Sequence, residues 1–213
     1  MQNHFDSIKR EAIEILSRSK GSHDWDHTER VYKLALRIGE KVDANLNIIG
    51  LAAILHDIAR REEGESCGKV CHAELGAIMA RKILERHGLK EDAIEEISHC
   101  IQTHRFRGNK SPKTLEAKIL FDADKLDSMG AVGIGRAFLF SGEHGARLHN
   151  KNVDLEKTEE YSREDTPYRE YLAKLRHLKD KMQTEEGGRM AESRHNFMEK
   201  FFERLNQEVD GLC

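Results

Sequence analysis

The stretch Ile49-Gly-Leu-Ala-Ala-Ile-Leu-His-Asp-Ile-Ala-Arg60 is the most apolar window in a chain of which 34% is charged. Its larger apolar residues recur at i, i+3, i+4 and i+7: Leu51, Ile54, Leu55 and Ile58. This spacing predicts a core helix. The helix would bury the adjacent pair His56-Asp57, which is costly unless a partner satisfies both side chains. That partner is either a hydrogen bond within the pair or a cation beside the helix. For an isolated pair the hydrogen bond is the usual solution, so the rest of the chain decides.

The composition predicts an all-α fold. The 213 residues hold two prolines and 6% aromatic residues, and strand-like runs of β-branched residues are missing. We expect a helical bundle formed by a single domain over 1–213. Its core would span about 22–140, followed by a flexible flap or connection at 141–166. Further helices at 167–210, with Gly187-Gly188 as a break, would pack on that core.

Charge and cysteine usage narrow the class of protein. The net charge is −3 with acids and bases interspersed, which argues against nucleic-acid or membrane partners. Neither a spanning segment nor a signal-peptide core is evident, so we expect a cytoplasmic protein with free thiols. Cys67-x₃-Cys71-His72 could form part of a zinc cluster, but a second ligand pair at finger spacing is lacking.

Several ionisable residues lie on helix faces that the apolar pattern predicts to be buried. They come from five predicted helices: His27, His56, Asp57, His72, His104 and Asp124. Each would point inward, although the pattern does not show that they meet. One bound divalent cation would satisfy the carboxylates and the imidazoles together. His99 lies on a polar face and is left out of this set, and Asp122 is expected to lie off the buried face.

The order of these residues resembles a known family. His27, the His56-Asp57 pair and Asp124 match the H…HD…D signature of the HD-domain metal-dependent phosphohydrolases. The flank His23-Asp24-Trp25-Asp26-His27 is similar to the family's first motif. The segments 133–137, 184–189 and 194–195 resemble a subgroup of small bacterial and archaeal members that includes nucleotide pyrophosphohydrolases. The similarity runs from Phe5 to about Leu205.

The resemblance implies a role for each matched residue. His27, His56, Asp57 and Asp124 would bind a divalent ion (Mn, Mg, Co or Fe), and Asp57 could bridge to a second one. His72 and His104 match positions that hold this second ion or contact phosphate. Arg60 stands where some nucleotidases of the family carry a glutamate that handles the water, so the general base is not identified.

We therefore expect a phosphohydrolase acting on a small nucleotide, either a nucleoside triphosphate pyrophosphohydrolase or a nucleotidase. Asp57 or Asp127 would accept the proton of the attacking water, and His72 or His104 would protonate the leaving oxygen or bind phosphate. Three cations would contact the substrate or else lie solvated on the surface: Arg60, Arg105 and Lys125.

Two alternatives remain open on the sequence. The set of four histidines and two aspartates also occurs in dinuclear HD proteins, which include cyclic-nucleotide phosphodiesterases and di-iron oxygenases. A nucleotide-binding regulatory module without catalysis is the other. The apolar last helix would close the domain or pair with a second copy in a homodimer.

Overall fold

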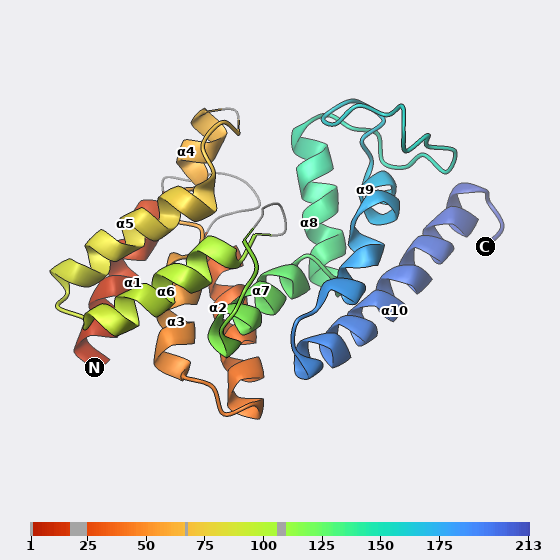
Figure 1. Ribbon diagram of the computed structural model, residues 1–213. Coiled ribbons are helices and arrows are strands. Elements are labelled where there is room, and N and C mark those ends of the chain that lie inside the picture. Colours follow the sequence, from red (N-terminus) through yellow and green to blue (C-terminus); the bar gives the residue numbers. More distant parts are fainter. Residues whose placement is uncertain (1, 18–24, 67, 106–109) are drawn as a thin grey trace. The chain divides into compact units, whose positions relative to one another are not determined.

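The computed structural model describes residues 2–17, 25–66, 68–105 and 110–213, and these residues form helices and no strands (Figure 1). The predicted all-α fold class is confirmed. The chain divides into two compact units, Met1–Asp124 and Lys125–Cys213, whose boundary falls inside one helix. The single packed domain expected from the sequence stays a prediction.

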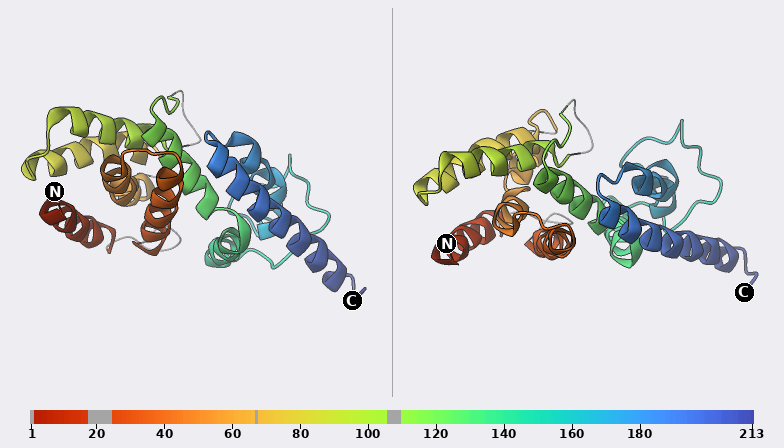
Figure 2. Two further views of the ribbon diagram at one scale, coloured as in Figure 1. Left: turned by 90° about the horizontal axis from the view of Figure 1, so that it is seen from below. Right: turned by 60° about the horizontal axis from the view of Figure 1, so that its bottom comes forward.

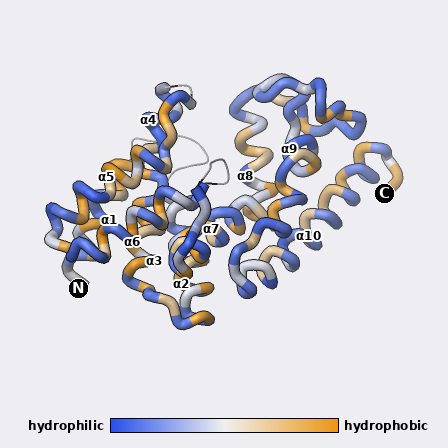
Figure 3. Tube along the Cα trace, viewed as in Figure 1, coloured by the Kyte–Doolittle hydropathy of each residue, from blue (hydrophilic) through white to orange (hydrophobic). Residues whose placement is uncertain are grey.

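The first unit is built around one apolar helix (Figure 3). Its helices are α1 (Gln2–Leu16), α2 (Trp25–Lys41), α3 (Leu46–Leu55), α4 (Arg60–Glu65), α5 (His72–Arg86), α6 (Glu91–Thr103) and most of α7 (Leu115–Asp127). Every residue of α3 from Ile48 to Leu55 is buried. α3 packs against α1, α2 and α6, while α5 and α6 run side by side (Figure 2). The burial of α3 on all sides explains why it is almost wholly apolar.

The helix α3 starts and stops through side-chain contacts with the backbone. Asn45 caps its start, because its Oδ1 accepts from the N–H groups of Asn47 and Ile48 at 3.2 and 3.3 Å. The expectation of one helix from Ile49 to Arg60 was wrong, since α3 ends at Leu55 and His56 is its C-cap. His56 Nδ1 donates to the carbonyl of Ala53 at 2.7 Å, an acceptor that a continuing helix would offer to the next residue's N–H.

A short turn follows α3, and the chain then enters α4. Arg60 N donates to Asp57 O at 3.0 Å. This i→i−3 hydrogen bond replaces the i→i−4 hydrogen bond of an α-helix. His56 and Asp57 therefore lie at a helix end rather than in its middle. Ser22 and Asp24, whose side chains could cap the start of α2, lie outside the described residues.

The second unit contains the end of α7, Lys125–Asp127, and four further elements. They are α8 (Gly130–Glu143), α9 (Pro167–Ala173), the 3-10 helix η1 (Leu175–Lys181) and α10 (Glu185–Val209). Residues 144–166 connect α8 to α9 without a helix. The expected helical break at Gly187-Gly188 was wrong, because Thr184 Oγ1 accepts from Gly187 N at 3.0 Å and starts α10 ahead of both glycines.

Aromatic packing forms the core of the second unit. Tyr171 stacks on Phe202 with ring centroids 4.5 Å apart, and Tyr168 contacts the same phenylalanine. Phe197 of α10 lies outside this core and is 50% exposed. No helix of the described chain is long and apolar enough to cross a membrane.

Candidate metal centre

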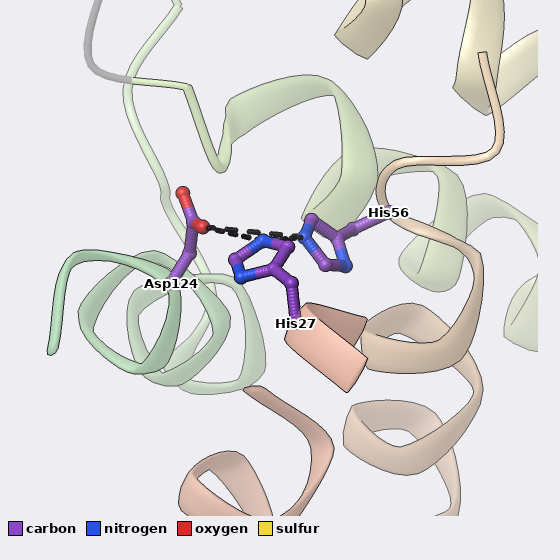
Figure 4. Close-up of side chains that lie close together, drawn as sticks. All are labelled: His27, His56 and Asp124. Carbon is purple, nitrogen blue, oxygen red and sulfur yellow. Dashed lines mark hydrogen bonds and ion pairs between the residues drawn. The ribbon is translucent and has the colours of Figure 1, made fainter. Parts of the chain in front are cut away.

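Three buried side chains from three helices converge in the first unit (Figure 4). His27 Nε2 lies 3.4 Å from Asp124 Oδ1 and 3.3 Å from His56 Nε2. His56 Nε2 is 4.0 Å from the same Asp124 oxygen. His27 comes from the first turn of α2, His56 from the end of α3 and Asp124 from the last turn of α7.

The carboxylate of Asp57 faces two groups of histidines, one with each oxygen. Oδ2 lies 3.5 Å from His27 Nε2 and 3.6 Å from His56 Nε2. Oδ1 lies 3.4 Å from His72 Nε2 and 3.6 Å from His104 Nε2. We call His27, His56, Asp124 and Asp57 Oδ2 the first cation position. Asp57 Oδ1 with His72 and His104 is the second cation position.

The Nδ1 atoms of three of these histidines are anchored away from the centre. His56 Nδ1 and His104 Nδ1 contact the carbonyls of Ala53 and Ile101 at 2.7 and 2.6 Å. His72 Nδ1 contacts Glu63 Oε2 at 2.8 Å. Carbonyl and carboxylate oxygens only accept, so each Nδ1 carries the donated proton. Nε2 of each ring is then the nitrogen that points to the centre, as in histidines that bind metals.

The donor set of the centre fits a divalent cation. Burial lowers the pKa of His56 to about 3, an effect larger than the opposing attraction of Asp57 and Asp124. His56 is therefore neutral, with an Nε2 lone pair. His72 and His104 bring their Nε2 atoms within 3.1 Å of each other. Two lone pairs at such a distance repel each other unless a metal ion or a proton lies between them. Imidazole nitrogens and carboxylate oxygens together suit divalent transition metals.

The prediction that six ionisable side chains point inward is confirmed by their burial. All are at most 9% exposed: His27, His56, Asp57, His72, His104 and Asp124. His99 is only partly buried and its Nε2 accepts from the Lys113 N–H at 3.1 Å, away from the two cation positions. The expectation for Asp122 was wrong, because this residue is fully buried.

Glu63 is a central residue that sequence reasoning missed. The short helix α4 places it one helical turn after Arg60, and the two side chains pair at 2.9 Å. The pair Arg60 and Glu63 at i, i+3 was the available signal. Burial raises the pKa of Glu63, but the hydrogen bond with His72 and the positive charges of Arg60 and Arg105 outweigh this effect and lower that pKa to about 2.

The two arginines expected to bind substrate have carboxylate partners within this unit. Arg60 Nε lies 3.0 Å from Asp57 Oδ1, in addition to its contact with Glu63. Arg105 Nη1 lies 2.7 Å from Glu63 Oε1 and donates to Cys71 Sγ at 3.4 Å. The alternative zinc set needs Cys67, which lies outside the described residues.

The remaining site candidates, Lys125 and Asp127, belong to the second unit. Both are buried, at 8% and 1% exposed. Asp127 Oδ2 pairs with Arg136 Nη1 at 2.8 Å. Their part in catalysis stays a prediction.

Comparison with known proteins supplies the family. The HD domain family model matches residues 24–129, which include the four signature positions. YpgQ of Bacillus subtilis is 34% identical over 202 residues, covering 93% of this chain and 90% of that protein. Its crystal structure in complex with ADP has a TM-score of 0.76 at 31% identity, over 99% of this chain and 97% of that one.

A second solved structure agrees. An HD-superfamily hydrolase of Bacillus thuringiensis is 29% identical with a TM-score of 0.76, over 98% of each chain. Both relatives match nearly end to end, and the H…HD…D residues of this chain converge in space. The chain belongs to the HD-domain family of metal-dependent phosphohydrolases.

Proposed function

We propose that this protein hydrolyses a phosphate bond of a small nucleotide, as a nucleoside triphosphate pyrophosphohydrolase or a nucleotidase. The observation that carries the proposal is the convergence of His27, His56 and Asp124 with the carboxylate of Asp57. The solved complex of the relative YpgQ with ADP supports a nucleotide as the substrate class.

The four signature residues would hold a divalent ion. Such an ion lowers the pKa of the water bound to it and polarises a phosphoryl oxygen. Mn²⁺, Mg²⁺, Co²⁺ and Fe²⁺ all suit the mixed donor set. Asp57 is our proposed proton acceptor, because its carboxylate faces both cation positions.

His72 and His104 would either hold a second ion or contact the phosphate. Glu63 fixes the Nδ1 side of the His72 ring, so Nε2 is the atom of His72 that would meet the phosphoryl oxygen or the ion. Arg105 lies beside Glu63 and Cys71 and is a further candidate for contact with substrate phosphate.

A panel of nucleoside mono-, di- and triphosphates tests the proposal. Metal-stripped protein would be supplied with Mn²⁺, and released phosphate and pyrophosphate would be measured separately. We expect release from at least one class, and loss of it in His56→Ala, which removes a ligand of the first cation position. Absence of any phosphate or pyrophosphate release from the whole panel would exclude this function.

A dinuclear phosphodiesterase is the second candidate, and the position of Asp57 between two histidine groups favours it. Cyclic nucleotides in the same panel would identify it. Metal analysis after purification without air distinguishes a di-iron oxygenase from a phosphohydrolase, because two irons per chain are expected for the oxygenase. Nucleotide binding that survives in His56→Ala without any turnover in the wild type would instead indicate a regulatory module.

A further inference from the structure

The two cation positions differ in the charge that surrounds them. The first combines oxygens of two carboxylates, Asp57 Oδ2 and Asp124 Oδ1, with two imidazoles. The second has a single carboxylate oxygen, Asp57 Oδ1, and Arg60 Nε lies 3.0 Å from that same atom. A cation at the second position would therefore share Asp57 Oδ1, its one carboxylate oxygen among the described residues, with a guanidinium.

The charge of Arg60 is permanent and held in place. A guanidinium does not lose its proton in proteins, and this one is fixed by Asp57 on one side and Glu63 on the other. Its side chain is only 22% exposed, so solvent screens its charge less than it would at the surface.

Glu63 does not restore the negative charge of the second position. It lies behind His72 and pairs with both Arg60 and Arg105. In formal charges, Arg60 and Arg105 offset Asp57 and Glu63. The further carboxylate of the centre, that of Asp124, belongs to the first position.

We propose that Arg60 is a positioning residue that makes the second cation position weak, so that the protein holds one divalent ion firmly and the second only at much higher metal concentration. This inference rests on the proposed function only in taking the centre to be the metal site of the hydrolase. It assigns to Arg60 control of metal loading rather than contact with the substrate.

Mn²⁺ binding to the metal-stripped full-length protein tests this inference, by calorimetric titration together with the electron paramagnetic resonance spectrum. For the wild type we expect one tight ion and a second that binds at least about 100-fold more weakly. In Arg60→Met the ratio between the two affinities should narrow about tenfold. The spectrum of a spin-coupled Mn²⁺ pair should appear at two equivalents of metal in this variant alone.

Two variants separate charge from packing. Arg61→Met changes the neighbouring residue of α4, whose partner is Glu65 at 2.6 Å, and should bind Mn²⁺ as the wild type does. Arg60→Lys keeps the charge without the planar fork and should leave the second position weak. Should Arg60→Met lose helicity by circular dichroism, Arg60→Gln replaces it in the same titration.

The inference is overturned by two equally tight ions in the wild type, or by an unchanged affinity ratio in a folded Arg60→Met or Arg60→Gln. Its failure differs from that of the proposed function. If the protein turns over a nucleotide but the ratio of the two Mn²⁺ affinities is unchanged in the variant, only the role of Arg60 is rejected. If the ratio of the two Mn²⁺ affinities changes as expected but no nucleotide is turned over, the proposed function is rejected and the role of Arg60 is retained.

Discussion

Each imidazole of the second cation position is oriented by a different kind of acceptor. His104 donates from Nδ1 to the carbonyl of Ile101, which belongs to its own helix end. His72 donates from Nδ1 to Glu63, a carboxylate of another helix. A backbone carbonyl cannot be changed by substitution, whereas Glu63 can. The orientation of His72 is therefore open to a direct test through its partner.

The pH dependence of stability should report the charge of Glu63. Its folded-state pKa is lowered from 4.5 to about 2, so between these values the unfolded state binds more protons than the folded state. Glu63 then stabilises the fold above about pH 4.5, and this contribution is lost as the pH falls toward 2. We expect Glu63→Gln to be less stable than the wild type at pH 7, by a gap that closes on acidification.

Urea denaturation of the metal-free protein at pH 7, 5, 4 and 3 measures this gap. Glu65→Gln is the matched control on α4, because Glu65 is 62% exposed and a surface substitution there should change the free energy of unfolding by no more than about 0.5 kcal/mol. A gap between wild type and Glu63→Gln that stays constant from pH 7 to pH 3 would contradict the assignment.

At the level of helices, the centre is built from helix ends. His27 lies in the first turn of α2 and His72 opens α5, whereas His56 and His104 are the C-caps of α3 and α6. At a helix end, backbone groups lack their helical partners and side chains can take their place. His56 and His104 use this freedom in the same way, each through Nδ1 and a carbonyl three residues earlier.

Helical periodicity predicted the buried faces well and the helix ends poorly. The spacing of apolar residues found the six ionisable side chains that form the two cation positions, because burial follows the face of a helix, although it missed the burial of Asp122. It missed the end of α3 at Leu55. There the side chain of His56 competes with the helical backbone for the carbonyl of Ala53, and the spacing of apolar residues carries no information about such a bond. It missed Glu63 for a related reason, since the short α4 that pairs it with Arg60 has no buried residue and thus no apolar pattern.

The glycines of α8 provide a matched pair for a stability prediction. A Cβ on Gly133 would lie 2.2 Å from the carbonyl oxygen of Ser128, in the turn that precedes the helix. A Cβ on Gly135 would meet nothing within 4 Å. Close approach to backbone cannot relax by moving a side chain, so Gly133→Ala should destabilise the protein by about 1–3 kcal/mol.

The control Gly135→Ala should do the opposite. Alanine in an exposed helix interior is favoured over glycine by about 1 kcal/mol, so this variant should be slightly more stable than the wild type. The denaturant midpoints of Gly133→Ala and Gly135→Ala, each compared with the wild type, test both predictions. Equal effects of both substitutions would show that Gly133 is not held by the turn at Ser128.

At the scale of the whole molecule, the boundary between the two compact units follows directly after a proposed ligand. The first unit ends at Asp124 and the second begins at Lys125, within the single helix α7. All residues of both cation positions belong to the first unit. The family model covers residues 24–129, so the part of the chain that matches the HD domain is nearly the first unit, and most of the second lies beyond it.

Metal binding should accordingly stabilise the first unit selectively. A ligand that binds only the folded state stabilises it by RT ln(1 + [L]/Kd), about 2.7 kcal/mol when its concentration is 100 times Kd. Amide hydrogens that exchange when the first unit opens should therefore exchange more slowly with Mn²⁺. The effect should be largest at the end of α3 and in the turn at Asp57, because the backbone there carries the ligands His56 and Asp57. Exchange in α10, which lies wholly in the second unit, should change little.

Hydrogen–deuterium exchange with mass spectrometry of the protein, with and without Mn²⁺, resolves the two units as separate peptides. His27→Ala removes a ligand of the first position and should abolish the protection around His56. Equal protection of α10 and the turn at Asp57 would mean that the units open together. In that case the free energy of metal binding would stabilise the whole chain, as expected for the single packed domain predicted from the sequence.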